Sequence, residues 1–138
     1  ANNFSLPLGP ALRSIACHPK DSFITIGLST GAIFVLEEHS GLILDSFRPH
    51  ERDVIKVLPY KSNQFFSCGR DSMERNCKLR LWSTTSVPAK SVQTFIGNNE
   101  TIQSFDVRNN TAFAVTQNTL CYTYLDQVLV SFFFFIFN

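Results

Sequence analysis

The chain has 138 residues, about the length of one domain, and 44% of them are hydrophobic, so it can bury a core. Its net charge is +1 with both signs scattered, which excludes the strongly basic surface typical of proteins that bind nucleic acid or acidic membranes. Four widely spaced cysteines, none in a C-x-x-C pair, favour free thiols in a reducing, cytosolic setting.

Short hydrophobic segments of strand length begin after residue 10. Residues 1–10 carry two prolines and a glycine without a hydrophobic period, so we predict a linker or an entering strand there. Four strands are predicted next: Leu12–Cys17, Phe23–Gly27, Ala32–Glu37 and Leu42–Phe47. Four glycines close to strand ends are predicted to lie in turns: Gly27, Gly31, Gly41 and Gly69. For Gly69, which precedes Arg70 and Asp71, we predict a positive φ.

The sequence then repeats itself with a period of roughly 42 residues, which is typical of four-stranded propeller blades. Residues 12–17 align with 54–59, and residues 23–27 align with 65–69. The next match, 31–35 with 78–82, requires an insertion in the second unit, which we place within Met73–Cys77. A weaker third unit contains Ile102–Val107, Thr111–Val115 and Thr119–Tyr124. The predicted units are therefore residues 11–48, 49–97 and 98–126.

Four side chains of the second unit are predicted to form a buried hydrogen-bonded tetrad. His50 precedes the predicted strand Val54–Leu58, Ser67 lies on the following strand, Asp71 lies in the turn after it, and Trp82 lies on the third strand. A buried imidazole needs a partner for each ring nitrogen, which Asp71 and Ser67 supply, and the indole N–H can donate to the serine oxygen. The corresponding positions are Leu8, Thr25, Ser29 and Val35 in the first unit, and fall near Asn98, Ala114, Asn118 and Cys121 in the third.

The histidine, the S-C-G-R-D segment, the L-R-L-W segment and the period together resemble the WD-repeat family. The resemblance implies an all-β fold, a partial WD-repeat β-propeller of about three four-stranded antiparallel blades that do not form a closed ring. Closed propellers use about 4–8 blades, so we expect further blades of the same full-length chain to complete it.

A narrower resemblance is carried by residues 11–16, 27–31, 41–44, 49–56, 79–82 and 102–106, taken in that order. These segments resemble the carboxy-terminal propeller of a family that joins a BEACH domain to a WD-repeat domain. The resemblance implies a cytosolic protein held peripherally on endosomal or autophagic membranes, without transmembrane insertion. It further implies early-to-late endosome transport, negative regulation of class III phosphatidylinositol 3-kinase and autophagy of aggregates. A second WD-repeat protein and subunits of the kinase complex would be the protein partners.

The leading functional hypothesis is a non-enzymatic protein-interaction scaffold without a cofactor, a metal or a nucleic-acid partner. A generic WD-repeat adaptor in another cytosolic complex is the first alternative. A hydrolase using Ser67, His50 and Asp71 is the second, but a catalytic triad needs its serine exposed beside an oxyanion hole, and here we expect it inside a sheet. A secreted domain glycosylated at Asn99 and Asn109 is a third alternative.

Two further groups of residues resemble binding sites only in part. Cys17, His18, His39 and Cys68 lack the closely paired spacing of structural zinc sites, so we predict core cysteines, surface histidines and no metal. Residues 47–50, F-R-P-H, keep only part of the phosphoinositide-binding F-R-R-G signature, which lacks here its second arginine and its glycine.

The tail, residues 127–138, has two interpretations. Five of its last seven residues are phenylalanine, and Gln127–Phe134 could supply the outer strand of the third unit. Alternatively, the run is translated intron sequence, because Val130-Ser131 can be encoded by the consensus start of an intron and T-rich sequence translates to phenylalanine. Sequencing the transcript distinguishes the two interpretations.

Overall fold

A computed structural model describes residues 11–71, 78–96, 102–117, 119–125, 130–132 and 134–137. The predicted linker 1–10 and the insertion within Met73–Cys77 lie outside the described residues, as do Asn98, Asn99 and Asn118. None of the described residues belongs to a helix, and so no helix long and apolar enough to cross a membrane occurs among them.

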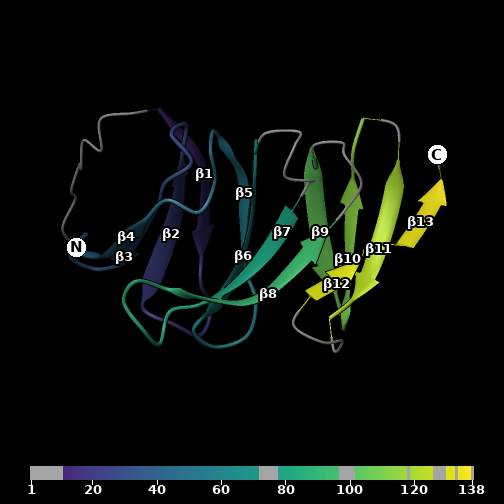
Figure 1. Ribbon diagram of the computed structural model, residues 1–138. Coiled ribbons are helices and arrows are strands. Elements are labelled where there is room, and N and C mark those ends of the chain that lie inside the picture. The colour runs from purple at the N-terminus through teal and green to yellow at the C-terminus, as the bar shows by residue number, and fades with distance from the viewer. Residues whose placement is uncertain are drawn as a thin grey trace.

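The described residues are all-β and form three sheets that do not close into a ring, which confirms the predicted fold class (Figure 1). The first sheet has the order β1-β2-β3-β4, with strands Leu12–Cys17, Phe23–Leu28, Ile33–Glu37 and Ile43–Phe47. The second has the order β12-β8-β7-β6-β5, with Val54–Pro59 (β5), Gln64–Gly69 (β6), Lys78–Ser83 (β7), Lys90–Ile96 (β8) and Val130–Phe132 (β12). The third has the order β13-β11-β10-β9, with Ser104–Arg108 (β9), Thr111–Val115 (β10), Leu120–Tyr124 (β11) and Phe134–Phe137 (β13).

The tail contributes strands to two sheets. Phe134–Phe137 pairs antiparallel with β11 as the outer strand of the third sheet. The predicted outer strand, Gln127–Phe134, shares only Phe134 with it. Val130–Phe132 pairs in parallel with β8, at the outer edge of the second sheet. One tail thus serves two neighbouring sheets, which the period of the repeat does not reveal. The intron hypothesis is a separate question and stays a prediction.

The sheets lie face to face (Figure 1). Hydrophobic side chains fill the two layers between them. The layer between the first and second sheets is built from nine buried residues: Ala16, Phe23, Ile33, Val35, Val54, Val57, Phe65, Trp82 and Ala89. The layer between the second and third contains Phe66, Cys68, Leu79, Leu81, Phe95, Ile102, Phe105, Ala112, Ala114, Cys121 and Leu125. Alternate residues of each strand point to opposite faces, so the second sheet contributes side chains to both layers.

The strand registers correct one detail of the predicted alignment. Ser67 pairs with Val57, whereas Ile15, the counterpart of Val57, pairs with Ile26 rather than with Thr25. A shift of one residue turns a side chain to the opposite face of a sheet. Ile26 therefore occupies the serine position of the first sheet, and Thr25 points toward the second sheet.

The predicted equivalents of Trp82 are wrong for the same reason. Trp82 pairs with Phe65, and the matching pair in the first sheet places Leu36, not Val35, at the tryptophan position. In the third sheet the register places Thr123 there, two residues after Cys121. Neither position offers an indole, so a complete tetrad is confined to the second sheet among the described residues.

Candidate functional site

The structure brings His50, Ser67, Asp71 and Trp82 together at one end of the second sheet. His50 Nδ1 lies 3.1 Å from Asp71 Oδ2, and His50 Nε2 lies 2.8 Å from Ser67 Oγ. The Trp82 indole N–H donates to the same serine oxygen at 2.8 Å. His50 is 2% exposed and Ser67 is fully buried, so these bonds lie out of reach of bulk water.

The geometry shows which group donates and which accepts each hydrogen bond of the tetrad. Burial on its own raises the pKa of Asp71, but the hydrogen bonds from the His50 ring and the Glu51 N–H, with the charge of Arg80, lower it overall below its usual value. An ionised Asp71 accepts from Nδ1–H of His50, and in the tautomer that carries its proton on Nδ1, Nε2 accepts the Ser67 hydroxyl proton. The resulting chain runs from the indole through the hydroxyl and the imidazole to the carboxylate, and every member is satisfied.

Two of the four predicted turn glycines have the conformation of turns. Gly31 and Gly41 have φ values of 90° and 72°, in the region that only glycine adopts readily. Gly27 and Gly69 lie inside β2 and β6, and the prediction of a positive φ at Gly69 is wrong. Gly69 is needed for space, because a Cβ there would lie 2.8 Å from Nδ1 of His50, well inside van der Waals contact.

Several contacts join the first sheet to the second, and the sequence reasoning missed three of the hydrogen bonds among them. Asp45 on β4 is 7% exposed and accepts the Ala89 N–H at 2.8 Å. The Asp21 carboxylate, in the turn between β1 and β2, accepts from the Asn63 N–H at 2.9 Å. The His50 N–H donates to the Gly31 carbonyl at 3.3 Å, which ties the tetrad to a turn of the first sheet. For the contacts of Asp45 and Asp21, the one sequence signal is an acid placed within or beside a strand. The bond between the backbones of His50 and Gly31 has none.

His18 is a buried histidine that the tetrad does not use. Its Nε2 lies 3.2 Å from the Thr25 hydroxyl, and its ring centroid lies 4.1 Å from that of Phe23 and 6.1 Å from that of Phe65. Burial lowers its pKa from 6.5 to about 4, against the opposing charge of Asp21. His18 is therefore a neutral packing residue at pH 7 rather than a surface group.

The residues considered for zinc are not brought together. Among the described residues no three His, Cys, Asp or Glu side chains are grouped to hold a metal ion. Among the described residues Cys17, Cys68 and Cys121 take part in no disulfide. Cys68 is buried as predicted, whereas the prediction of a core position is wrong for Cys17, which is exposed. The predicted surface position of His18 is wrong, as its burial between the first and second sheets shows.

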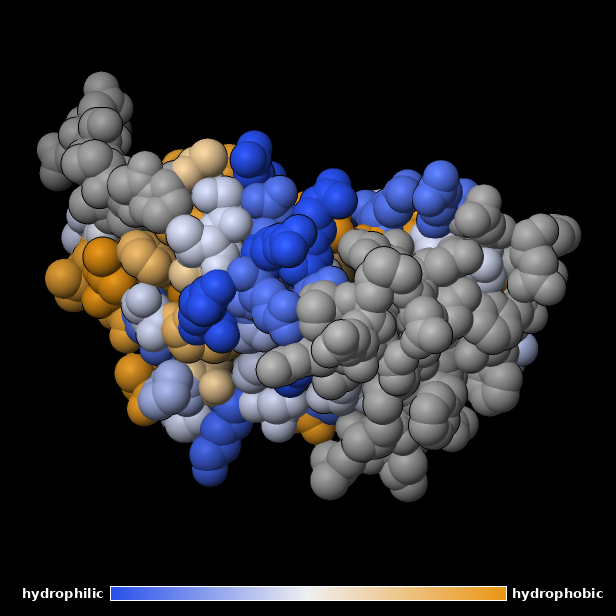
Figure 2. All heavy atoms as spheres, turned by 45° about the horizontal axis from the view of Figure 1, so that its top comes forward, coloured by the Kyte–Doolittle hydropathy of each residue, from blue (hydrophilic) through white to orange (hydrophobic). Residues whose placement is uncertain are grey.

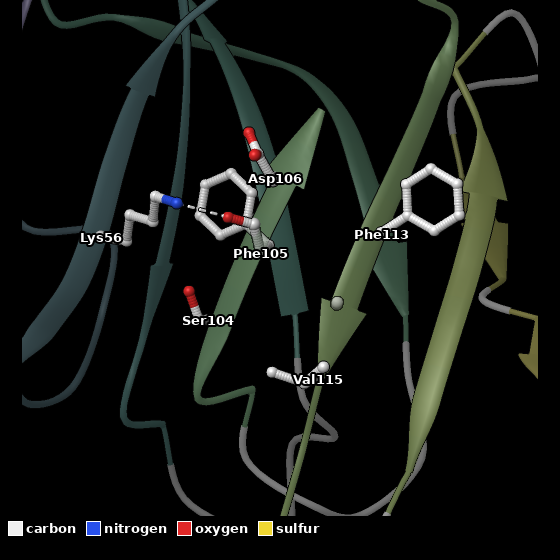
Figure 3. Close-up of a pocket in the computed structure, with 7 residues that line it drawn as sticks. Lys56, Ser104, Phe105, Asp106, Phe113 and Val115 are labelled. Carbon is white, nitrogen blue, oxygen red and sulfur yellow. Dashed lines mark hydrogen bonds between the residues drawn. The ribbon is translucent and has the colours of Figure 1, made fainter. Parts of the chain in front are cut away.

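Hollows also lie on surfaces that the tetrad does not occupy, and two of them adjoin contacts between sheets. One, of about 270 Å³, lies on the third sheet and is lined in part by Ser104, Asp106, Phe113 and Val115 (Figure 3). At its edge the Lys56 ammonium group donates to the Phe105 carbonyl at 2.5 Å, which links the second sheet to the third.

The second hollow, of about 310 Å³, is lined by Arg13, Asp53, Ile55 and Arg70. The Asp53 carboxylate lies 3.3 Å from Nε of Arg13 and 3.6 Å from Nε of Arg70. Arg13 and Arg70 remain 49% and 61% exposed, so their guanidinium groups keep N–H donors directed toward solvent.

Comparison with known proteins supports the fold alone. No family model matches the sequence, and no curated protein matches it. The computationally designed Ika4 protein superposes with a TM-score of 0.72 at 16% identity, over 91% of this chain and 71% of that one. The designed Ika8 protein gives 0.69 at 16% identity, covering 89% of this chain and 35% of its own. The Cps50 (Swd1) beta-propeller domain of Myceliophteria_thermophila gives 0.68 at 11% identity, covering 82% and 37%.

The chain thus has a partial, propeller-like fold, and it spans little more than a third of two of these three structures.

Proposed function

We propose that this chain is a non-enzymatic protein-interaction scaffold of the WD-repeat type. The carrying observation is the state of Ser67, whose hydroxyl is fully buried and held between His50 and Trp82. A serine nucleophile must be open to substrate beside an oxyanion hole. On this proposal Ser67, His50 and Asp71, the candidate triad of the sequence, have a structural role: their hydrogen bonds stabilise the second sheet.

A rigid stack of sheets offers its loops as a binding surface, and function concentrates on loops held by such a scaffold. We place the surface at the hollow formed by Arg13, Asp53 and Arg70. Asp53 partly neutralises the two guanidinium groups and holds them side by side. Arginine binds carboxylates and phosphates through paired N–H donors, so an acidic segment of a partner protein fits this hollow best.

The finer proposal is a role in endosomal maturation and autophagy. Its support is the resemblance of the segments described above to the carboxy-terminal propeller of WD repeat-containing protein 81. On this proposal the partners are a second WD-repeat protein and subunits of the class III phosphatidylinositol 3-kinase complex, met at the endosomal surface. A scaffold that serves another cytosolic complex is the alternative.

The test measures binding of the purified chain to each of those purified partners by biolayer interferometry. We expect the Arg13→Glu, Arg70→Glu double variant to bind at least about tenfold more weakly, because two charge-assisted contacts are lost. The matched control is Arg108→Glu, an exposed arginine on the third sheet, which should bind as the wild type does. Absence of binding by the wild type would refute the endosomal proposal.

Labelling with a serine-reactive fluorophosphonate separates a scaffold from a hydrolase. A hydroxyl buried between two partners should not react, so we expect no label on Ser67 in the folded chain. Label at Ser67 that disappears in His50→Ala would overturn the scaffold assignment.

A further inference from the structure

The hollow lined by Arg13, Asp53, Ile55 and Arg70 bridges two sheets of this chain. Arg13 lies on β1 of the first sheet, whereas Ile55 lies on β5 and Arg70 follows β6 in the second. Its lining therefore needs no residue from any other blade. Figure 2 brings forward the top of Figure 1, the end at which β1 begins, and strongly hydrophilic side chains gather in the middle of this view.

The backbone on both sides of the hollow is held in place by hydrogen bonds. The Arg70 N–H donates to the Asp53 carbonyl at 2.9 Å, which joins the residue after β6 to the residue before β5. The Ser14 hydroxyl donates to the Val54 carbonyl at 3.2 Å, which joins β1 to β5 beside the hollow. A site that is ordered before its ligand arrives loses less entropy on binding.

The two guanidinium groups have N–H donors to spare. Asp53 meets each of them at Nε, Arg13 at 3.3 Å and Arg70 at 3.6 Å, and it is their one ion-pair partner among the described residues. The terminal Nη groups are therefore free to donate to a ligand, and both side chains are about half exposed. Donors from two arginines can thus converge on one anion.

The charges of the lining favour an anion with two negative charges. Two arginines and one aspartate give the hollow a net charge of +1 before a ligand binds. A carboxylate carries one charge and two oxygens, which a single guanidinium group can satisfy. A phosphate monoester carries nearly two charges at pH 7 and three terminal oxygens, so it can bridge both guanidinium groups.

A phosphorylated side chain suits the hollow better than a membrane lipid does. The hollow measures about 310 Å³, which is room for a single side chain, and Ile55 offers an apolar wall to its carbon atoms. Anionic membranes are bound by clusters of several basic residues, and the net charge of this chain is only +1 with both signs scattered.

We infer that this hollow binds the phosphate group of a phosphorylated serine or threonine in a partner protein. The inference rests on the proposed function, because it names the chemistry of the acidic segment that the scaffold recognises. Arg13 and Arg70 both donate to the phosphate oxygens, and Asp53 keeps the two guanidinium groups side by side. Phosphorylation of the partner then decides whether it binds.

The test is an NMR titration of the ¹⁵N-labelled full chain with N-acetyl-O-phosphoserine N-methylamide. We expect saturable shifts of the amide signals of Arg13, Asp53 and Arg70. The phosphoserine probe should bind at least about tenfold more tightly than the matching glutamate derivative, because it engages both arginines. No saturable shift at these residues would overturn the inference.

Charge-conserving variants separate a specific site from general electrostatic attraction. Arg13→Lys and Arg70→Lys retain the charge but lose the paired N–H donors, so each should weaken binding of the phosphoserine probe at least about fivefold. The matched control is Arg108→Lys, at an exposed position on β9, which should bind as the wild type does. Equal affinities of all three variants and the wild type would overturn the site, because net charge alone would then account for the binding.

The remaining outcomes distinguish this inference from the proposed function. Equal affinities for the phosphoserine and glutamate probes would overturn the preference for phosphate and leave the acidic segment in place. Cosedimentation with phosphatidylcholine vesicles that contain phosphatidylinositol 3-phosphate, lost in Arg13→Lys, would overturn the protein source of the phosphate. Saturable binding of the phosphoserine probe supports the site even where the interferometry experiment detects no binding to the endosomal partners, a result that refutes the endosomal role alone.

Discussion

Ser67→Ala is the sharpest test of the structural interpretation of the tetrad. The substitution removes one hydroxyl and leaves two buried groups without their partner, the indole N–H of Trp82 and Nε2 of His50. Each unsatisfied buried group costs about 1–3 kcal/mol, and His50 and Trp82 are only 2% and 7% exposed, so water cannot easily replace the hydroxyl. With two such groups, we expect the free energy of unfolding to fall by about 2–6 kcal/mol.

The assay is urea denaturation followed by far-UV circular dichroism, because the chain has a single tryptophan and that tryptophan belongs to the network. Ser62→Ala is the matched control: its hydroxyl donates to Asp21 at 3.1 Å in an exposed setting, so its loss should cost less than about 1 kcal/mol. A double-mutant cycle with Trp82→Phe should be non-additive by about 0.5–3 kcal/mol, since either change breaks the same bond. Equal midpoints for Ser67→Ala and Ser62→Ala, or strict additivity in the cycle, would refute the reasoning.

Three further predictions concern stability. Because burial lowers the pKa of His18 from 6.5 to about 4, the unfolded chain binds a proton over that range and the folded chain does not, so stability should fall as the pH drops from 6.5 to about 4. His18→Gln should flatten this dependence in urea midpoints measured at each pH, and an unchanged slope would contradict the assignment. Gly69→Ala should cost about 1–3 kcal/mol in urea denaturation, because the new methyl group meets the His50 ring, and a neutral effect would exclude that contact. Asp45→Ala should cost about 1–3 kcal/mol in the same assay by leaving the Ala89 N–H without its acceptor, and an unchanged midpoint would show that the bond between the sheets contributes nothing.

The fold class could be predicted from the sequence because the repeat and the alternation of apolar residues reflect the geometry of the strands themselves. The tetrad residues were also identified in advance, since a buried imidazole restricts its partners to few residue types. The structure places these four side chains within hydrogen-bonding distance of one another.

Strand register is where sequence reasoning failed. Thr25 and Val35 align with Ser67 and Trp82 when residues are counted, yet pairing within the first sheet turns both to the opposite face. A side chain changes face with every residue, so an error of one position inverts its environment. Counting along the chain does not reveal a bulge, and the one between Leu12 and Ser14 is of that kind.

Contacts between sheets were also beyond prediction. The burial of His18 depends on aromatic rings from two sheets, Phe23 and Phe65, that only the stacked arrangement brings together. The role of Asp45 depends on an amide in the next repeat. Local periodicity carries no information on either contact, because both depend on how one sheet is rotated against the next.

The division of the tail between β8 and β11 has a consequence for how the molecule responds to a cut. Both strands donate and accept backbone hydrogen bonds along edges that the tail segments cover. A single cut ahead of Val130 would separate both tail strands from the chain, and when they dissociate two edges are uncovered together. Uncovered strand edges pair with strands of other molecules. The cleaved protein should therefore self-associate through the exposed edges of β8 and β11. Cleavage in a loop that pairs with no strand would leave both edges covered.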